Sequence, residues 1–314
     1  MDWVFSGLGL VILLLAGDAL VRGAVNLSLR IGIPALIVSL TIVAFGTSAP
    51  ELLISITAAL EGVPGIALGN VVGSNTANIL LVLGVPALLA TMHTSECNTR
   101  KSYVLMMVGS VLFIALAMLG IFNWTSGIIL LIALAFVLFD AVRDARAHRA
   151  AGEDPELEEP EGADPDMPWW KIVVFLTLGL VGLPLGADLL LKGATSIARG
   201  FGVSETVIGL TLVAIGTSLP ELATTVMAAL RRQADVALGN VIGSNMFNLL
   251  AIIGVASLVS PIPVDPEILK FDLWVMLGAS ALLFPFVFLG WNINRIWGVA
   301  LTALYALYVL SVLT

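Results

Sequence analysis

Residues 46–84 read GTSAPELLISITAALEGVPGIALGNVVGSNTANILLVLG, and residues 216–254 repeat this sequence as GTSLPELATTVMAALRRQADVALGNVIGSNMFNLLAIIG. The two copies align without a gap at a constant offset of 170, with 20 of 39 positions identical. Each copy carries a glutamate, Glu51 or Glu221, near its start in an apolar setting. Acids inside a membrane are costly, and they are functional by default. Their matched placement therefore predicts a shared task, which we interpret as the binding of a cation.

Composition places the chain in a membrane. Hydrophobic residues make up 59% of it, charged residues 11%, and the mean hydropathy is +1.06, whereas soluble domains carry about 25% charged residues. Eight of the 22 acids lie within residues 153–166, and the remaining 14 balance the 14 basic residues. The chain therefore lacks the basic excess of a nucleic-acid-binding protein. A single cysteine, Cys97, excludes an internal disulfide framework and a cysteine-rich metal site.

Ten apolar segments are long enough to cross a bilayer, which takes about 20 residues. We expect an all-α polytopic membrane protein with two five-helix halves, residues 1–142 and 169–314. The acidic linker at 143–168 cannot bury a core, so we expect it to be mobile. The expected spans are 3–24, 33–60, 64–91, 102–119, 122–142, 169–191, 203–230, 234–259, 271–289 and 293–313.

Basic residues predict the orientation, because cytoplasmic loops are enriched in Lys and Arg. With the N-terminus outside, cytoplasmic loops hold eleven basic residues and outside loops hold three. Both termini are then outside and the linker is cytoplasmic. The repeat begins in the second and seventh spans, which are separated by an odd number of crossings, so the two copies run in opposite directions. Inverted repeats of this kind are typical of secondary transporters, whose ion sites lie near the midplane.

Each copy also predicts a broken helix. Pro50 lacks a backbone N–H and follows Gly46, so the span 33–60 is expected to break and restart there. The carbonyls freed by a break are tolerated at membrane depth only beside protein or a water-filled cavity. With the Thr47 and Ser48 hydroxyls and the Glu51 carboxylate they form an oxygen-rich patch. The second copy repeats this pattern with Ala214, Thr217, Ser218, Pro220 and Glu221.

The spans 64–91 and 234–259 supply further oxygen donors, Asn78 and Asn248, near their midpoints. Hard cations such as Ca²⁺ take six to eight oxygen ligands, whereas soft transition metals prefer Cys or His. His93 and His148 lie at span edges and are expected to be solvated. The pattern therefore favours a hard cation.

Two structural readings compete with a ligand role. Ser48-x-x-Glu51 and Ser218-x-x-Glu221 both fit a capping box, in which the two side chains satisfy N–H groups of a restarting helix. Small residues such as Gly69, Gly73 and Ser74 permit close helix packing. For the glutamates we favour cation binding, because a neutral glutamine would cap a helix in a membrane at lower cost.

At GTSAPE…GNVVGSNTANILLVLG and GTSLPE…GNVIGSNMFNLLAIIG the chain closely resembles the sodium/calcium exchanger family of the cation/Ca²⁺ antiporters, in its prokaryotic form with two alpha repeats. The resemblance implies a ten-span transporter of a prokaryotic cell membrane, with Na⁺ and Ca²⁺ as substrates. It implies no cofactor, no enzymatic activity and no obligate protein partner.

The resemblance also implies roles for individual residues. Glu51 and Glu221 would be the central Ca²⁺ ligands, helped by the carbonyls of Thr47 and Thr217. The flanking Na⁺ sites would be lined by Ser48, Ser218, Ser74, Ser244 and the carbonyls of Ala44 and Ala214, and Asn78 and Asn248 would complete the middle. Some family members have aspartate where this chain has Asn248, and that acid accompanies K⁺ co-transport in one branch. K⁺ dependence is therefore not expected here.

Charge limits the transport cycle. Two carboxylates are neutralised by one Ca²⁺ or by two monovalent cations, and crossing with an empty site would cost ~2.5–3.5 kcal/mol per acid. This cost favours exchange over leak, and we expect Na⁺/Ca²⁺ antiport by alternating access. A Ca²⁺/H⁺ antiporter is the nearest alternative, because two protons neutralise the same glutamates. A cation channel is an alternative from another class, and an intramembrane enzyme is disfavoured because the chain has no His-Glu-x-x-His motif.

Overall fold

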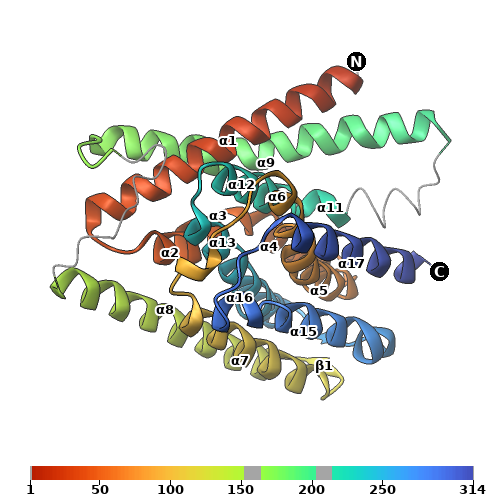
Figure 1. The fold of residues 1–314 in the computed structure, drawn as a ribbon. Helices are drawn as coiled ribbons and strands as arrows, with labels where there is room; N and C mark the ends of the chain where they lie inside the picture. Colours follow the sequence, from red (N-terminus) through yellow and green to blue (C-terminus); the bar gives the residue numbers. More distant parts are fainter. Residues whose placement is uncertain (1, 152–163, 203–213, 314) are drawn as a thin grey trace.

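The computed structural model describes residues 2–151, 164–202 and 214–313. Within these ranges the secondary structure is helical apart from one short antiparallel pair, β1 (Ile121–Phe122) with β2 (Ile262–Pro263), and an isolated antiparallel bridge between Met92 and Ile293 (Figure 1). In the described part, eight helical segments are long and apolar enough to cross a membrane. The prediction of an all-helical polytopic protein is therefore confirmed.

Eight of the ten expected spans appear as long apolar helices or as short helices in series. They are α1 (Asp2–Ile31), α5 and α6 (Gly65–Leu80, Gly84–Leu89), α7 (Arg100–Ala117), α8 (Trp124–Ala151), α9 (Trp169–Gly200), α13, η4 and α14 (Ala234–Met246, Phe247–Ile252, Ile253–Val259), η5, α15 and α16 (Ile268–Asp272, Leu273–Ala281, Phe284–Phe288) and α17 (Arg295–Leu313). The expected span 33–60 is a bent pair of helices. Half of the expected span 203–230 lies outside the described residues.

The helix breaks occur where the repeats predict them. In the first half α2 (Ala35–Val38), η1 (Ser39–Val43) and α3 (Ala44–Thr47) run into α4 (Ala49–Leu60) with a 43° bend. Ser48 at the bend has φ −85° and ψ 5°. In the second half Ser218, with φ −87° and ψ 6°, separates α11 (Ala214–Thr217) from α12 (Leu219–Leu230). A proline, Pro50 or Pro220, is the second residue of each new helix, where its missing N–H would have no intrahelical partner.

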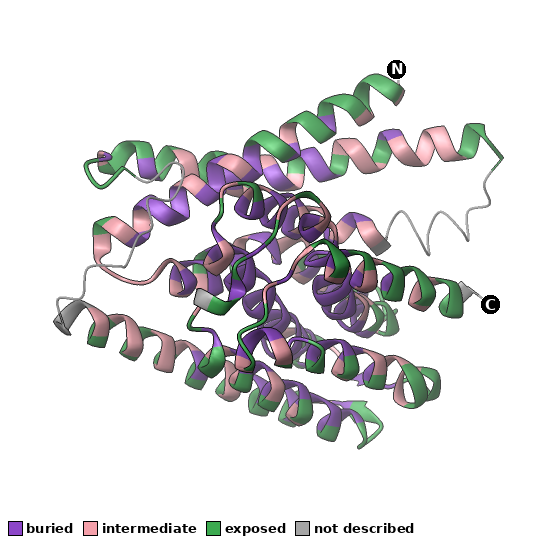
Figure 2. Cartoon of the chain, viewed as in Figure 1, coloured by how far each residue is buried: buried purple, intermediate pink, exposed green. Residues whose placement is uncertain are grey.

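The centre of the molecule is formed by the second span of each repeated segment. Of the apolar stretch in α5–α6, 78% is buried, and in α13–α14 83% is buried, against 17–44% in the other candidate spans (Figure 2). Helices α4 and α12 pack on α5 and α13 respectively. Both breaks are therefore held against the most buried helices.

Helices α1 and α9 lie side by side along one edge of the molecule (Figure 1). Small residues at their contact let the backbones approach: an added Cβ at Gly179 would lie 2.8 Å from the Leu20 Cα, and one at Gly186 would lie 2.8 Å from the Leu13 nitrogen. In lipid no hydrophobic effect drives helices together. Small residues permit the close van der Waals packing that stabilises helix pairs instead.

We expect Gly179→Ala to lower the thermal stability, because the methyl group would be forced against the Leu20 backbone. Overpacking of this kind costs about 1–3 kcal/mol. Gly278→Ala in α15 is the matched control, since no described atom lies within 4 Å of its added Cβ, and alanine is the better helix former by about 1 kcal/mol. Thermal unfolding followed by tryptophan fluorescence in detergent measures both. Equal midpoints for the two variants would contradict the packing account.

The segment after the fifth span differs from the sequence-based expectation. We expected a mobile linker from residue 143, but α8 continues as a helix to Ala151. The sequence AVRDARAHRAA at 141–151 is rich in Ala and Arg, which are strong helix formers. Where the described residues resume, the Asp164 N–H donates to the Asn26 side chain of α1 at 2.8 Å. The rest of the expected linker, 152–163, lies outside the described residues.

Candidate cation site

Each break places a glutamate in the first turn of a restarting helix. Glu51 lies in α4 and Glu221 in α12, and each is only 1% exposed. The N-terminus of a helix carries partial positive charge, which stabilises a nearby carboxylate. The Ser48 hydroxyl, three residues before Glu51, lies within hydrogen-bonding distance of the Glu221 carboxylate. The predicted pair of buried acids is therefore brought together in space.

The two halves meet through the hydroxyls of the first break. Ser48 Oγ donates to Glu221 Oε1 over 3.3 Å, so a side chain of the first half reaches the carboxylate of the second. Thr47 Oγ1 donates to the Asn240 side chain over 3.2 Å and lies 3.4 Å from Ser244 Oγ. These contacts connect α3 with α12 and α13 around a common centre.

Several buried oxygens of this region accept no hydrogen bond from a described residue. Natively folded proteins leave few buried polar atoms unpaired, so each needs an explanation. They are Oε2 of Glu51, Oε2 of Glu221, Oγ of Ser218 and Oδ1 of Asn75, Asn78 and Asn248. A set of carboxylate, hydroxyl and amide oxygens matches the ligands that a hard cation takes. The donor chemistry therefore fits Ca²⁺ and Na⁺ as transported substrates.

The capping-box interpretation is wrong. Neither Ser48 nor Ser218 makes a side-chain capping hydrogen bond. The Ser48 hydroxyl is instead directed at Glu221, in the other half of the chain. The two serines are thus left available for a role other than capping.

Close packing accounts for glycines in the second repeat. An added Cβ at Gly239 would lie 2.8 Å from the Leu36 carbonyl oxygen, and one at Gly243 would approach the Leu40 carbonyl carbon to 3.0 Å. The equivalent glycines of the first repeat, Gly69 and Gly73, have no described atom within 4 Å. The segment that corresponds to Leu36 and Leu40 falls outside the described residues, so the packing interpretation for Gly69 and Gly73 stays a prediction.

The other predicted site residues lie on helices that pack against α4 or α12. Ser74 and Asn78 are buried on α5, Ser244 on α13 and Asn248 in the π-helical turn η4. Turns of π-helix occur frequently at functional sites. Thr217 is half-buried at the end of α11, and Ala44 is buried at the start of α3. Ala214 begins α11, directly after residues that are not described.

Two asparagines were missing from the predicted ligand set. The Asn240 amide donates to the Glu221 backbone carbonyl over 3.4 Å and to Thr225 Oγ1 over 3.2 Å. Asn70 makes the equivalent bonds to the Glu51 carbonyl and Ser55 Oγ, over 3.5 and 3.4 Å. Both side chains hold the first turn of the glutamate-bearing helix in place. The signal for them was the Gly-Asn dipeptide shared by the two repeats.

We expect Asn240→Ala to reduce ion binding more than Asn70→Ala does. Asn240 also accepts from Thr47 of the other half, whereas the bonds of Asn70 stay within its own half. Leaving a buried partner unsatisfied costs about 1–3 kcal/mol, which corresponds to roughly fivefold to 150-fold in affinity. Ca²⁺ titration of the purified variants by calorimetry measures the difference. Equal affinities in the two variants would show that the contact with Thr47 contributes nothing.

A second pair of asparagines joins α5 to α13. The Asn75 side chain donates to the Asn245 backbone carbonyl over 3.3 Å, and Asn245 returns the same bond to the Asn75 carbonyl over 3.4 Å. The Asn78 amide donates to Asn245 Oδ1 over 3.0 Å, which leaves the Asn78 oxygen as the buried acceptor noted above. This exchange of bonds orients the Asn78 amide at the centre of the molecule.

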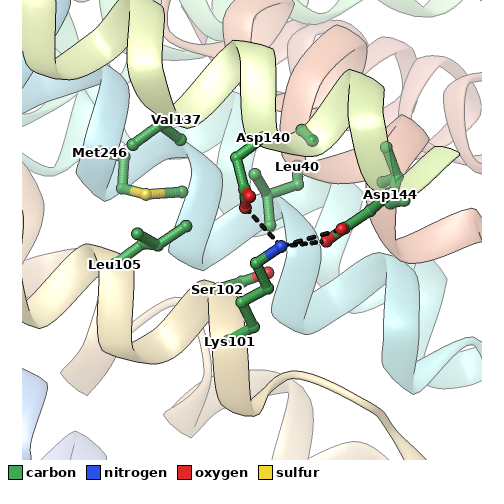
Figure 3. Close-up of a pocket in the computed structure, with 10 residues that line it drawn as sticks. Leu40, Lys101, Ser102, Leu105, Val137, Asp140, Asp144 and Met246 are labelled. Carbon is green, nitrogen blue, oxygen red and sulfur yellow. Dashed lines mark hydrogen bonds and ion pairs between the residues drawn. The ribbon is translucent and has the colours of Figure 1, made fainter. Parts of the chain in front are cut away.

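A small pocket elsewhere holds two more acids, but both are already paired with a lysine. Lys101 Nζ lies 2.7 Å from both Asp140 and Asp144, which project from α8 (Figure 3). The pocket also contacts Leu40 and Met246. Because lysine occupies the carboxylates, this pocket is poorly suited to a cation. Among the described residues, no three His, Cys, Asp or Glu side chains are grouped as a metal site.

The fold and the site together define a class. This is a polytopic helical membrane protein that buries two acids and neutral oxygen donors at the junction of two repeated segments, as ion transporters do.

Comparison with known proteins identifies the family. The family model for the sodium/calcium exchanger protein matches residues 1–142 and 171–314. The sodium/calcium exchanger MaX1 of Methanosarcina acetivorans is 34% identical over 339 residues, covering 96% of this chain and 95% of MaX1. The inner membrane protein YrbG of Escherichia coli is 36% identical over 286 residues, covering 90% and 87%. The solved structure of the sodium-calcium exchanger NCX_Mj has a TM-score of 0.83 at 32% identity, covering 99% and 98%. The chain belongs to the sodium/calcium exchanger family, and it is a cation antiporter rather than an enzyme.

Proposed function

We propose that this protein exchanges Na⁺ for Ca²⁺ by alternating access to the site between the two glutamates. The observation that carries the proposal is the set of buried oxygens without a hydrogen-bond donor on α4, on α12 and on the helices packed against them. Such a set is costly unless cations satisfy it. Its two negative charges match one Ca²⁺ or two Na⁺, which gives a physical basis for competition between the ions.

The roles follow the chemistry of each group. Glu51 and Glu221 bind Ca²⁺ in the centre, with the carbonyls of Thr47 and Thr217. Hydroxyls and carbonyls on either side bind Na⁺, and the amide oxygens of the two central asparagines close the middle of the site. The flanking ligands are Ser48, Ser218, Ser74, Ser244, Ala44 and Ala214, and the amides are those of Asn78 and Asn248. The contacts of Ser48 with Glu221 and of Thr47 with Ser244 support this arrangement.

The proposal includes a topology. Ten spans form two inverted halves, residues 1–142 and 169–314, around a cytoplasmic linker at 143–168, with both termini outside in the membrane of a prokaryotic cell. The distribution of basic residues supports the orientation. Similarity to exchangers from archaea and to an inner membrane protein of a bacterium supports the location. Labelling of single introduced cysteines near residues 2 and 313 in intact cells tests which side the termini occupy.

Uptake of ⁴⁵Ca²⁺ into proteoliposomes loaded with Na⁺ tests the function. Uptake that requires the outward Na⁺ gradient is the expected result. A separate set of vesicles carries only a pH gradient. Uptake driven by that gradient alone would replace Na⁺ with H⁺ as the coupling ion and would leave the hydroxyls with a structural role. Flux without any gradient coupling would indicate a channel.

A further inference from the structure

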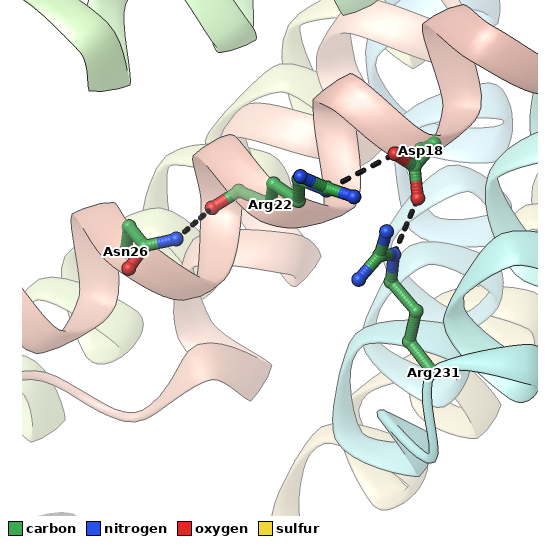
Figure 4. A network of polar contacts seen from close by, with 4 residues as sticks. All are labelled: Asp18, Arg22, Asn26 and Arg231. Atoms are coloured by element: carbon green, nitrogen blue, oxygen red, sulfur yellow. Dashed lines mark hydrogen bonds and ion pairs between the residues drawn. The ribbon is translucent and has the colours of Figure 1, made fainter. Parts of the chain in front are cut away.

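Two arginines meet one aspartate where α1 packs against the end of α12. Asp18 of α1 pairs with Arg22 one turn further along, at 3.0 Å, and with Arg231, which follows α12 (Figure 4). Asp18 and Arg231 are only 20% and 14% exposed. The Asn26 amide donates to the Arg22 backbone carbonyl over 2.8 Å. We refer to the Asp18–Arg231 contact as the cross-helix bridge, because it links α1 to the helix that carries Glu221.

The repeat lacks an equivalent of this bridge in its other half. At the offset of 170, Asp18 corresponds to Asp188, whose partner within its own helix is Lys192 at 2.7 Å. Arg231, however, corresponds to Glu61. The contact equivalent to the cross-helix bridge would therefore bring Asp188 against Glu61, and both are acids. Like charges in contact are destabilising, whereas the bridge is attractive.

The packing of the two halves differs in the same place. Helix α1 lies along α12 closely enough that an added Cβ at Gly17 would be 2.9 Å from the Ala223 carbonyl. By contrast α9 and α4, the equivalent pair, make at most marginal contact. Ala223 is accordingly 7% exposed, while its equivalent on α4, Leu53, is 66% exposed. Of the two repeat-related helices, α12 is therefore covered by α1, whereas α4 is not covered by α9.

Under the alternating access proposed above, this asymmetry would belong to one of two arrangements. When the two halves of an inverted repeat exchange their conformations, the access of the site changes side. In the exchanged arrangement α9 would cover α4, and α1 would leave α12. Breaking the cross-helix bridge would then be accompanied by the approach of Asp188 to Glu61.

We propose that the cross-helix bridge holds the transporter in the arrangement described here, and that the charge of Glu61 opposes the exchanged one. The two arrangements are therefore unequal in energy although the repeats have similar sequences. The proposal rests on the alternating access proposed above, but it does not depend on which ions are exchanged. It names Asp18, Arg231 and Glu61 as residues that set the resting conformation and lie outside the ion site.

A distance measurement tests the proposal. Spin labels on cysteines introduced at Leu60 of α4 and Leu185 of α9, both exposed positions, report the approach of α9 to α4 in a Cys97→Ser background. In nanodiscs in Na⁺ buffer we expect Asp18→Asn and Arg231→Gln to increase the population with the shorter distance by about threefold to fivefold, as expected for a partly exposed ion pair. Glu61→Arg should increase it as well, because the introduced guanidinium would pair with Asp188.

The double variant Arg231→Glu with Glu61→Arg replaces the attraction to Asp18 with an attraction to Asp188. It should give the largest increase in the population with the shorter distance. Lys101→Gln, which breaks an ion pair of α7 with α8, is the control and should leave the distances unchanged. Unchanged distances in the double variant, in protein that remains monodisperse, would overturn the proposal. The distances and the ⁴⁵Ca²⁺ flux are read separately. A shift in distance without Na⁺-driven flux would support the role of the bridge and reject the proposed function. Na⁺-driven flux without a shift in distance would support the proposed function and reject the role of the bridge.

Discussion

Glu221→Gln should abolish Na⁺-driven Ca²⁺ uptake, and so should Glu51→Gln. Each substitution keeps the size of the side chain and halves the negative charge of the site, so a divalent ion is no longer neutralised. We expect Ca²⁺ affinity to fall at least a hundredfold, which corresponds to about 2.7 kcal/mol. Initial rates of ⁴⁵Ca²⁺ uptake measure the transport loss, and the Ca²⁺ dependence of the unfolding temperature measures the loss of binding.

Thermal stability separates a ligand role from a structural one. In the absence of Ca²⁺ the glutamine variants should unfold at the same or a higher temperature than the wild type, because burying a carboxylate without a bound cation is costly and a neutral amide avoids that cost. Wild-type protein should gain about 2.7 kcal/mol at a Ca²⁺ concentration of 100 Kd, and the variants should gain almost nothing. Glu267→Gln changes an exposed acid and serves as the matched control. Wild-type flux in either site variant would sink the assignment of the site.

The repeat made the local structure predictable. The sequence Gly-Thr-Ser-x-Pro-Glu predicted a break, and in both copies the helix is interrupted at the serine before the new helix, Ser48 or Ser218. These features follow from proline and glycine chemistry within a few residues. The presence of two buried acids was predictable for the same reason, since each lies within one turn of its break.

The contacts between the halves were not predictable from the pattern. Ser48 donates to Glu221 rather than serving as a helix cap beside Glu51. Thr47 reaches Asn240 across 193 positions of the chain. Such contacts depend on how two distant segments pack, and neither periodicity nor spacing encodes that. The different surroundings of Leu53 and Ala223 show the same limit, because equivalent positions of a repeat need not share an environment in one conformation.

The end of α8 shows a different limit. The charged residues after 142 indicated a linker by composition, but their intrinsic helix propensity allowed α8 to continue beyond its apolar part. Composition therefore predicted where the apolar span ends and did not predict where the helix ends.

Asn245→Leu should be the most destabilising substitution of an uncharged residue in the central helices. The side chain accepts from the Asn78 amide and donates to the Asn75 carbonyl, and all three residues are at most 1% exposed. Leucine removes both bonds: the buried Asn78 amide loses its acceptor, and the Asn75 carbonyl, which lies inside α5, loses its second donor. At about 1–3 kcal/mol for the unsatisfied amide and about 0.5–1.5 kcal/mol for the second bond, the expected loss is roughly 1.5–4.5 kcal/mol, a large fraction of the 5–15 kcal/mol that typically stabilises a fold.

Asn75→Leu is the matched comparison, because Asn75 occupies the equivalent position on α5 and the two residues exchange bonds. Its amide donates to the Asn245 carbonyl, but its own side-chain oxygen accepts from no described residue. Removing it therefore leaves fewer stranded groups, so the midpoint of thermal unfolding should fall less than in Asn245→Leu. A larger fall in Asn75→Leu would mean that its side-chain oxygen is satisfied in the protein, by a bound cation or by water. Repeating both measurements with saturating Ca²⁺ distinguishes these cases, since only a cation ligand would make the cost of Asn75→Leu depend on Ca²⁺.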